Sequence, residues 1–187
     1  MLKHKGTVAI ETKRLLLRRF TLDDAAGAYN NWASDPEVCR YMRWQPHKDR
    51  SETLNILGAW LEAYARDSFY QWAVTLKEND EPIGAICLSV VNENDLCGDT
   101  AYCIGRKYWG QGITAEALKA VLAFAFKEAG FNRIEAYHSV NNPASGKVMQ
   151  KAGMVFEGTA RQKYKCISGF EDSAMYAILR EDYMNKE

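Results

Sequence analysis

The sequence lacks the features that mark exported, membrane-spanning and metal-binding proteins. Its five cysteines are an odd number without a C-x-x-C pair, so they fit neither a disulfide framework nor a zinc site. Its three histidines, His4, His47 and His138, are too dispersed to predict a metal centre. The first residues do not resemble a signal peptide, and no apolar run reaches the roughly 18 residues of a membrane span. We therefore expect a cytoplasmic protein with no metal and no membrane partner.

The sequence also lacks an excess of charges of one sign and a flexible linker between domains. The 24 basic residues balance the 24 acidic ones, so no long-range field attracts the chain to nucleic acid. The one basic and aromatic cluster, Arg161 to Lys165, is short, and we interpret it as a solvated strand edge. The four prolines are scattered and no repeat or low-complexity stretch occurs. These 187 residues, 1–187, are thus expected to form a single domain without a nucleic-acid partner.

Hydrophobic periodicity predicts alternating strands and helices. Leu15 and Leu17 alternate with charged neighbours, which is typical of a strand with one buried face. Thr21 with Asp24 resembles a capping box, and Ser51 is the expected cap of a longer helix. The expected strands are 12–20, 70–76, 83–91, 99–104, 133–140, 156–164 and 172–179, and the expected helices are 21–32, a short one after Pro36, 51–64, 113–130 and 144–152. Together they predict a mixed α+β sheet flanked by helices.

A glycine loop between a strand and a helix concentrates the chemistry. Gly110 and Gly112 let backbone N–H groups approach an anion closely, and the helix that begins after Gly112 adds unpaired donors and partial positive charge. Arg106 and Lys107 supply full charges nearby. No Gly-Lys-Ser/Thr follows and G-x-G-x-x-G is incomplete, which excludes a Walker loop and a dinucleotide fingerprint. The loop therefore predicts another phosphate-bearing ligand.

Six ordered motifs carry a family resemblance across nearly the whole chain. They are T-K-R-L-L-L-R-R-F at 12–20, S-D-P-E-V at 34–38, W-G-Q-G with Glu116 and Ala117, N-x-x-S at 142–145, K-A-G-M at 151–154 and a C-terminal D-x-x-x-Y. In these motifs the chain resembles the GCN5-related N-acetyltransferases (GNAT), and within them the ribosomal-protein-alanine acetyltransferase branch. The resemblance implies a mostly antiparallel twisted sheet of about seven strands, splayed centrally to admit acetyl-CoA.

The resemblance also implies which residues bind the acetyl-CoA co-substrate. The pyrophosphate would lie on the loop from Lys107 to Gly112, and the pantetheine arm would pair with the backbone around Cys103 and Ile104. Asn142 would bond the co-substrate or nearby backbone. The implied binding residues are Cys103, Ile104, Arg106, Lys107, Gly110, Gln111, Gly112, Thr114 and Asn142.

Acetyl transfer requires a base for the amine and a proton donor for the departing thiolate. Asp99 is the leading candidate base because it stands near the start of the strand that leads to the loop, with Glu93 and Glu135 as alternatives. Met149 occupies a position where many relatives carry the tyrosine that protonates the thiolate. Ser145 is the candidate donor that the ribosomal-protein branch implies, and a plain helix N-cap is its competing interpretation.

The acceptor amine is open at this stage. The resemblance favours a protein or peptide N-terminus, with an antibiotic, polyamine or amino acid as alternatives, and a non-catalytic acetyl-CoA-binding regulator as a different class. Tyr41 and Trp44 are candidates to line the acceptor pocket, and core packing is the competing interpretation. Cys103 is expected to be a small core residue because no activating base is apparent beside it. The final strands could pair two subunits as a homodimer.

Overall fold

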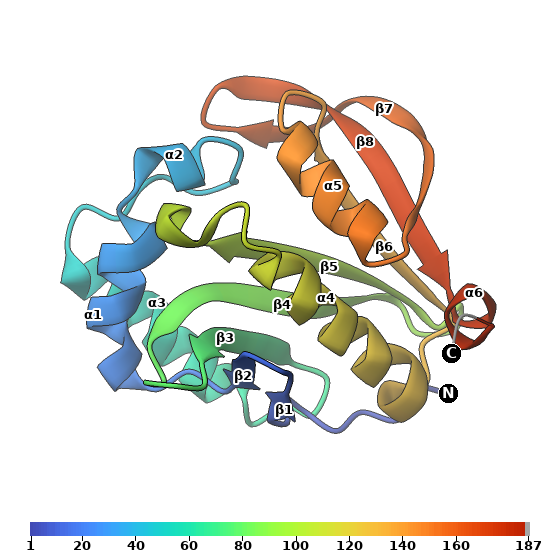
Figure 1. Ribbon diagram of the computed structural model, residues 1–187, viewed down its shortest axis with the longest axis horizontal. Coiled ribbons are helices and arrows are strands. Elements are labelled where there is room, and N and C mark those ends of the chain that lie inside the picture. Colours follow the sequence, from blue (N-terminus) through green and yellow to red (C-terminus); the bar gives the residue numbers. More distant parts are fainter. Residues whose placement is uncertain (186–187) are drawn as a thin grey trace.

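A computed structural model describes residues 1–185 and contains one eight-stranded sheet with the order β1-β2-β3-β4-β5-β6-β8-β7 (Figure 1). All neighbouring strands are antiparallel except β5 and β6. The strands are β1 Ile10–Glu11, β2 Leu15–Arg18, β3 Tyr70–Leu76, β4 Pro82–Asn92, β5 Cys97–Ile104, β6 Arg133–Ser139, β7 Val155–Cys166 and β8 Gly169–Leu179. The α-helices are α1 Ala25–Ala28, α2 Pro36–Cys39, α3 Arg50–Ala63, α4 Ile113–Ala123, α5 Pro143–Lys151 and α6 Arg180–Met184. The expected mixed α+β sheet is confirmed.

Helices cover both faces of the sheet. The larger core lies under α4 and α5, where Leu15, Leu17 and Leu118 are fully buried. The smaller core packs Leu57 of α3 and Trp32 against the opposite face. This burial of alternate strand positions explains why Leu15 and Leu17 read as one face of a strand.

The sheet divides between β5 and β6. These strands are parallel neighbours over three residue pairs, from Cys97 with Arg133 to Asp99 with Glu135. Beyond Asp99, β5 continues beside β4 to Ile104, while β6 continues beside β8 to Ser139. In Figure 1 the two parts of the sheet meet near the C-terminus and separate toward α2. The predicted central splay is therefore present, and Asp99 lies where it begins.

Two local predictions are wrong for identifiable reasons. The expected strand 12–20 is shorter, with only Leu15–Arg18 forming β2. The Thr12 N–H donates to the Leu15 carbonyl and the Thr12 hydroxyl accepts from the Leu15 N–H, both at 2.9 Å, which turns the chain between β1 and β2. The longer helix is capped by Asp49, whose carboxylate accepts hydrogen bonds from the N–H groups of Ser51 (2.9 Å) and Glu52 (3.1 Å). Ser51 lies inside the first turn, because the aspartate two residues earlier already satisfies those donors.

The α4 segment ends as its sequence predicts, and a π-helical stretch at Phe124–Ala129 extends it before Gly130. Gly130 has φ +80°, the left-handed conformation that favours glycine after a helix. None of the helices within residues 1–185 combines the length and the apolar character that crossing a bilayer requires.

Candidate active site

A cavity of about 390 Å³ opens where β5 and β6 separate. Its wall combines α2 and the residues after it, the end of β5, the glycine loop and α5. Because β5 has no strand partner on its β6 side after Asp99, its backbone on that side is available to an extended ligand. The lining residues are Glu37, Val38, Arg40, Tyr41, Met42, Tyr102, Cys103, Ile104, Tyr108, Trp109, Gly110, Gly112, Thr114, Ala115, Asn142, Ala144, Ser145, Lys147, Val148 and Lys151.

The glycine loop enters α4 through two left-handed residues. Gly110 and Gly112 both have φ +74°, a conformation in which a side chain costs about 1–2 kcal/mol. The Trp109 indole donates to the Ile104 carbonyl at 2.9 Å, and the Gln111 amide donates to the Lys107 carbonyl at 2.9 Å. These bonds hold the loop at the start of α4, where the backbone N–H groups of the first turn lack helical partners and are available to an anion.

Arg14 and Glu116 attach the loop and α4 to the first hairpin. The Arg14 guanidinium donates to the Glu116 carboxylate at 2.7 Å and to the Gln111 carbonyl at 3.0 Å, and the Thr12 hydroxyl donates to Glu116 at 2.7 Å. Burial by itself would raise the pKa of Glu116, but these hydrogen bonds outweigh it and lower the pKa, so the carboxylate stays charged. The anion-facing loop is thereby braced from the far edge of the sheet.

The predicted co-substrate residues fall into two groups. Six line the cavity: Cys103, Ile104, Gly110, Gly112, Thr114 and Asn142. Three do not line it. Arg106 pairs with Asp35 at 3.1 Å, the Lys107 ammonium lies 5.1 Å from the Tyr108 ring centre, and Gln111 bonds its own loop.

Other cations, which sequence reasoning missed, line the cavity in their place. Arg40 is the residue directly after α2, and Lys147 and Lys151 lie on one face of α5. The available signal was the four-residue spacing of Lys147 and Lys151, which begins two residues after Ser145 and places both lysines on the same side of a helix.

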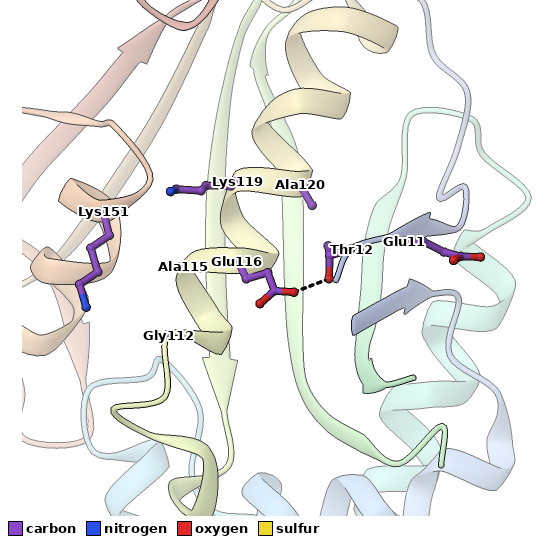
Figure 2. A pocket seen from close by; sticks show the side chains of 8 residues that line it. All are labelled: Glu11, Thr12, Gly112, Ala115, Glu116, Lys119, Ala120 and Lys151. Atoms are coloured by element: carbon purple, nitrogen blue, oxygen red, sulfur yellow. Dashed lines mark hydrogen bonds between the residues drawn. The ribbon is translucent and has the colours of Figure 1, made fainter. Parts of the chain in front are cut away.

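A second, shallower depression of about 620 Å³ adjoins the cavity and shares Gly112, Ala115 and Lys151 with it. Figure 2 shows Lys119 of α4 and Lys151 of α5 directed into the space between these helices, while Thr12 bonds Glu116 on the other side of α4. Positive charge therefore continues from the glycine loop outward between α4 and α5.

Asp99 is the last β5 residue that pairs with β6 and shares a strand face with Cys103. Its carboxyl is half-buried. Burial and then the neighbouring Glu135 raise the pKa of Asp99, while the Lys163 and Arg43 charges partly offset them. A carboxylate with a raised pKa is better suited to removing a proton from an amine than an ordinary surface aspartate.

The two alternative bases are engaged elsewhere. Glu135 pairs with Arg133 at 2.8 Å, and Glu93 lies 3.4 Å from the His4 ring at the turn between β4 and β5. Asp99 forms no ion pair within residues 1–185.

Ser145 meets a tyrosine that sequence reasoning missed. The hydroxyl groups of Ser145 and Tyr102 are 3.0 Å apart, and both residues line the cavity. Burial raises the pKa of Tyr102, so its phenol stays protonated at neutral pH. The helix N-cap position before α5 belongs to Asn142, so the N-cap interpretation of Ser145 is wrong. Met149 is buried in the core and does not line the cavity.

The remaining candidates are placed as follows. Burial raises the pKa of Cys103 to about 12, so its thiol is a poor nucleophile even though it lines the cavity. Tyr41 lines the cavity, whereas Trp44 packs on the smaller core beside α3. Residues 1–185 contain no group of three or more His, Cys, Asp or Glu side chains arranged to hold a metal ion.

Residues 14–155 match the family model described as "Acetyltransferase (GNAT) domain". The chain is 33% identical over 181 residues to the uncharacterized N-acetyltransferase YnaD of Bacillus subtilis, covering 93% of this chain and 98% of YnaD. It is 26% identical to the [ribosomal protein uS5]-alanine N-acetyltransferase of Escherichia coli, covering 94% and 93%. A GNAT-family acetyltransferase structure from Bacillus anthracis superposes with a TM-score of 0.81 at 26% identity, covering 93% of this chain and 99% of that one. The chain therefore belongs to the GNAT family of acetyltransferases and is an N-acetyltransferase.

Proposed function

We propose that this enzyme transfers the acetyl group of acetyl-CoA, the acyl donor of its family, directly to the N-terminal amine of a protein or peptide. The observation that carries the proposal is the parting of β5 and β6 immediately after Asp99, with the cavity beyond it. A likeness to the uS5-alanine acetyltransferase supports the choice of a protein N-terminus over a small amine.

Acetyl-CoA fits the cavity by its chemistry. The α4 amides after Gly112 suit the pyrophosphate, and the free edge of β5 near Cys103 and Ile104 suits the amide groups of the pantetheine arm. Lys147, Lys151 and Lys119 extend the positive charge along α5 and α4, where the remaining phosphate of the co-substrate would find partners. In this assignment Arg106 and Lys107 add long-range attraction and make no direct contact.

Asp99 acts as the base in this proposal. An α-amine is largely protonated at neutral pH and must lose a proton, directly or through a water, before it attacks the thioester carbonyl. The half-buried position of Asp99 beside Glu135 favours proton uptake. Glu135 forms an ion pair with Arg133 at 2.8 Å, so it is less available to take up the proton of the amine.

Ser145 donates a proton to the departing thiolate, and Tyr102 orients it. The phenol is within hydrogen-bond distance of both the Ser145 hydroxyl (3.0 Å) and the Ser145 carbonyl (3.1 Å), which restricts the rotation of the serine side chain. A donor held in place before the reaction begins avoids the cost of ordering it later. Tyr102 is thus a positioning residue in this scheme.

The test is release of free thiol from acetyl-CoA by the purified protein, with peptides of different N-terminal residues beside spermidine, free amino acids and aminoglycosides. Release that depends on peptide N-termini supports the proposal, and release only with a small amine replaces the acceptor class. Calorimetry with acetyl-CoA is the companion measurement. Absent binding would contradict the whole assignment, and tight binding without turnover of any acceptor would favour a regulator.

A further inference from the structure

Two cations converge on the ring of Tyr137 from different parts of the chain. The Arg43 guanidinium, in the loop after α2, lies 5.9 Å from the Tyr137 ring centre and 5.2 Å from that of Tyr164. It donates a hydrogen bond to the Tyr137 hydroxyl at 2.8 Å. The Lys163 ammonium, from β7, lies 5.3 Å from the same ring. We call Arg43 and Lys163 the cation pair.

Neither member of the cation pair forms an ion pair within residues 1–185. Neither side chain has a carboxylate within 4.0 Å. By contrast, two arginines of the sheet pair with carboxylates: Arg18 with Asp24 and Arg133 with Glu135, both at 2.8 Å. Two like charges over one ring repel each other, and Asp99, the nearby carboxyl on which both charges act, lies beyond 4.0 Å, so the pair is open to a further anion.

Irregular backbone places both cations. In β7 a bulge between Ala160 and Tyr164 alters the pairing with β8, and Gln162 within it has φ +48°. Asp172 holds the bulge by accepting a hydrogen bond from the Gln162 N–H at 2.8 Å. Bulges redirect side chains and concentrate near functional sites, and Lys163 follows the residue with the unfavourable φ.

The loop that carries Arg43 is tied down at Tyr41. The Tyr41 hydroxyl donates to the Asn141 carbonyl at 2.9 Å, and the Tyr164 hydroxyl donates to the Tyr41 carbonyl at 3.2 Å. These bonds join the loop after α2 to the β6–β8–β7 part of the sheet, beside the cavity that Tyr41 lines. The loop is therefore held in position, and Arg43 on it is an exposed residue.

The cation pair lies next to Asp99. Tyr137 is two residues after Glu135 on the same face of β6, and Glu135 is the register partner of Asp99. The Lys163 and Arg43 charges also act on the Asp99 carboxyl, where they partly offset the rise in its pKa. An acceptor whose amine reaches Asp99 would bring its neighbouring atoms to the cation pair.

We propose that the cation pair binds an anionic group of the acceptor, a carboxylate or phosphate carried a few atoms from the amine that Asp99 deprotonates. The proposal rests on the proposed acetyl transfer and names its acceptor class. A guanidinium stacked on two rings keeps free N–H donors in the fork that matches a carboxylate or phosphate, and the lysine adds a point charge. With the peptide acceptor proposed above, the anion is an acidic side chain near the N-terminal residue; the carboxylate or phosphate of a small amine is the other source, which the test distinguishes.

The test compares acceptors that differ only in the anion. Peptides beginning Ala-Asp and Ala-Asn form one arm, and glucosamine 6-phosphate with glucosamine, and alanine with alaninamide, form the other. We expect the wild type to favour the anionic member of at least one pair by about 10- to 100-fold in kcat/KM, mainly through the acceptor KM. The arm in which the preference occurs identifies the source of the anion.

The variants are Arg43→Gln, Lys163→Gln and the double substitution. The double variant is expected to lose the preference while its KM for acetyl-CoA and its Tm are unchanged, and Arg43→Lys is expected to restore part of it. Lys165→Gln is the matched control, because this exposed lysine of the same strand lies 5.9 Å from the Phe170 ring, away from Tyr137. It should keep the wild-type preference.

Calorimetry makes the test independent of turnover. The same acceptor pairs are titrated into enzyme saturated with CoA, where no acetyl group can be transferred. Tighter binding of the anionic member that disappears in Arg43→Gln supports the proposal. Equal binding of both members in every pair, or a preference that the double variant retains, overturns it. Failure of the acetyl transfer itself is recognised separately, by absent thiol release with all acceptors.

Discussion

Replacing Asp99 with asparagine tests the proposed base most directly. The amide has almost the same shape but cannot take up a proton, and the nearest carboxylate, Glu135, is engaged by Arg133 at 2.8 Å. Loss of a general base lowers kcat by about 100- to 10,000-fold, or about 3–5 kcal/mol on the activation barrier. We expect an effect in this range, with the KM for acetyl-CoA unchanged because Asp99 is not among the residues that line the cavity.

The assay is thiol release with one saturating acceptor, accompanied by thermal unfolding. Asp99→Asn removes one of two adjacent like charges, so its Tm is not expected to fall. Glu93→Gln serves as the control, because Glu93 lies beside His4 at the turn that follows β4. A normal kcat in Asp99→Asn would refute the reasoning, and loss of activity in Glu93→Gln would assign the base there.

Three further predictions concern the same site. Tyr102→Phe should lower kcat by about 2- to 10-fold, the effect expected from the loss of one hydrogen bond. In a Ser145→Ala background the same substitution should not lower kcat further. An equal loss of kcat in that background would show that Tyr102 does not act through Ser145. Because the pKa of Asp99 is raised, kcat/KM should begin to fall at a higher pH than it would with an ordinary aspartate as the base. The base becomes protonated, and activity is lost, as the pH falls through this pKa. Glu135→Gln removes a like charge, so the acid limb should move to lower pH with the same acceptor, and a limb that stays in place would exclude this coupling. Gly112→Ala introduces about 1–2 kcal/mol of strain at φ +74°, and we expect a higher KM for acetyl-CoA in steady-state kinetics with little change in kcat.

Much of the fold could be predicted because its signals are local. The strand over Tyr70–Leu76 and the helix that starts after Gly112 and ends at Gly130 coincide with the expected limits, since alternation and glycine signals act over a few residues. The first hairpin was not predicted, because its turn depends on two hydrogen bonds between Thr12 and Leu15 that leave no strong turn signal in the sequence. The same turn creates β1, which is the strand that the structure has in addition to the seven expected from the sequence.

The sequence by itself determined the glycine loop, the helix behind it and the strand before it, because the conformations of Gly110 and Gly112 and the periodicity around them are properties of short segments. The tertiary structure decided which groups meet there. Asp99 comes beside Glu135 only through the parallel pairing of β5 with β6, and Arg43 meets Tyr137 only through the loop after α2. Such contacts join residues far apart in the sequence, so their geometry depends on how the whole sheet twists and divides and not on any local pattern.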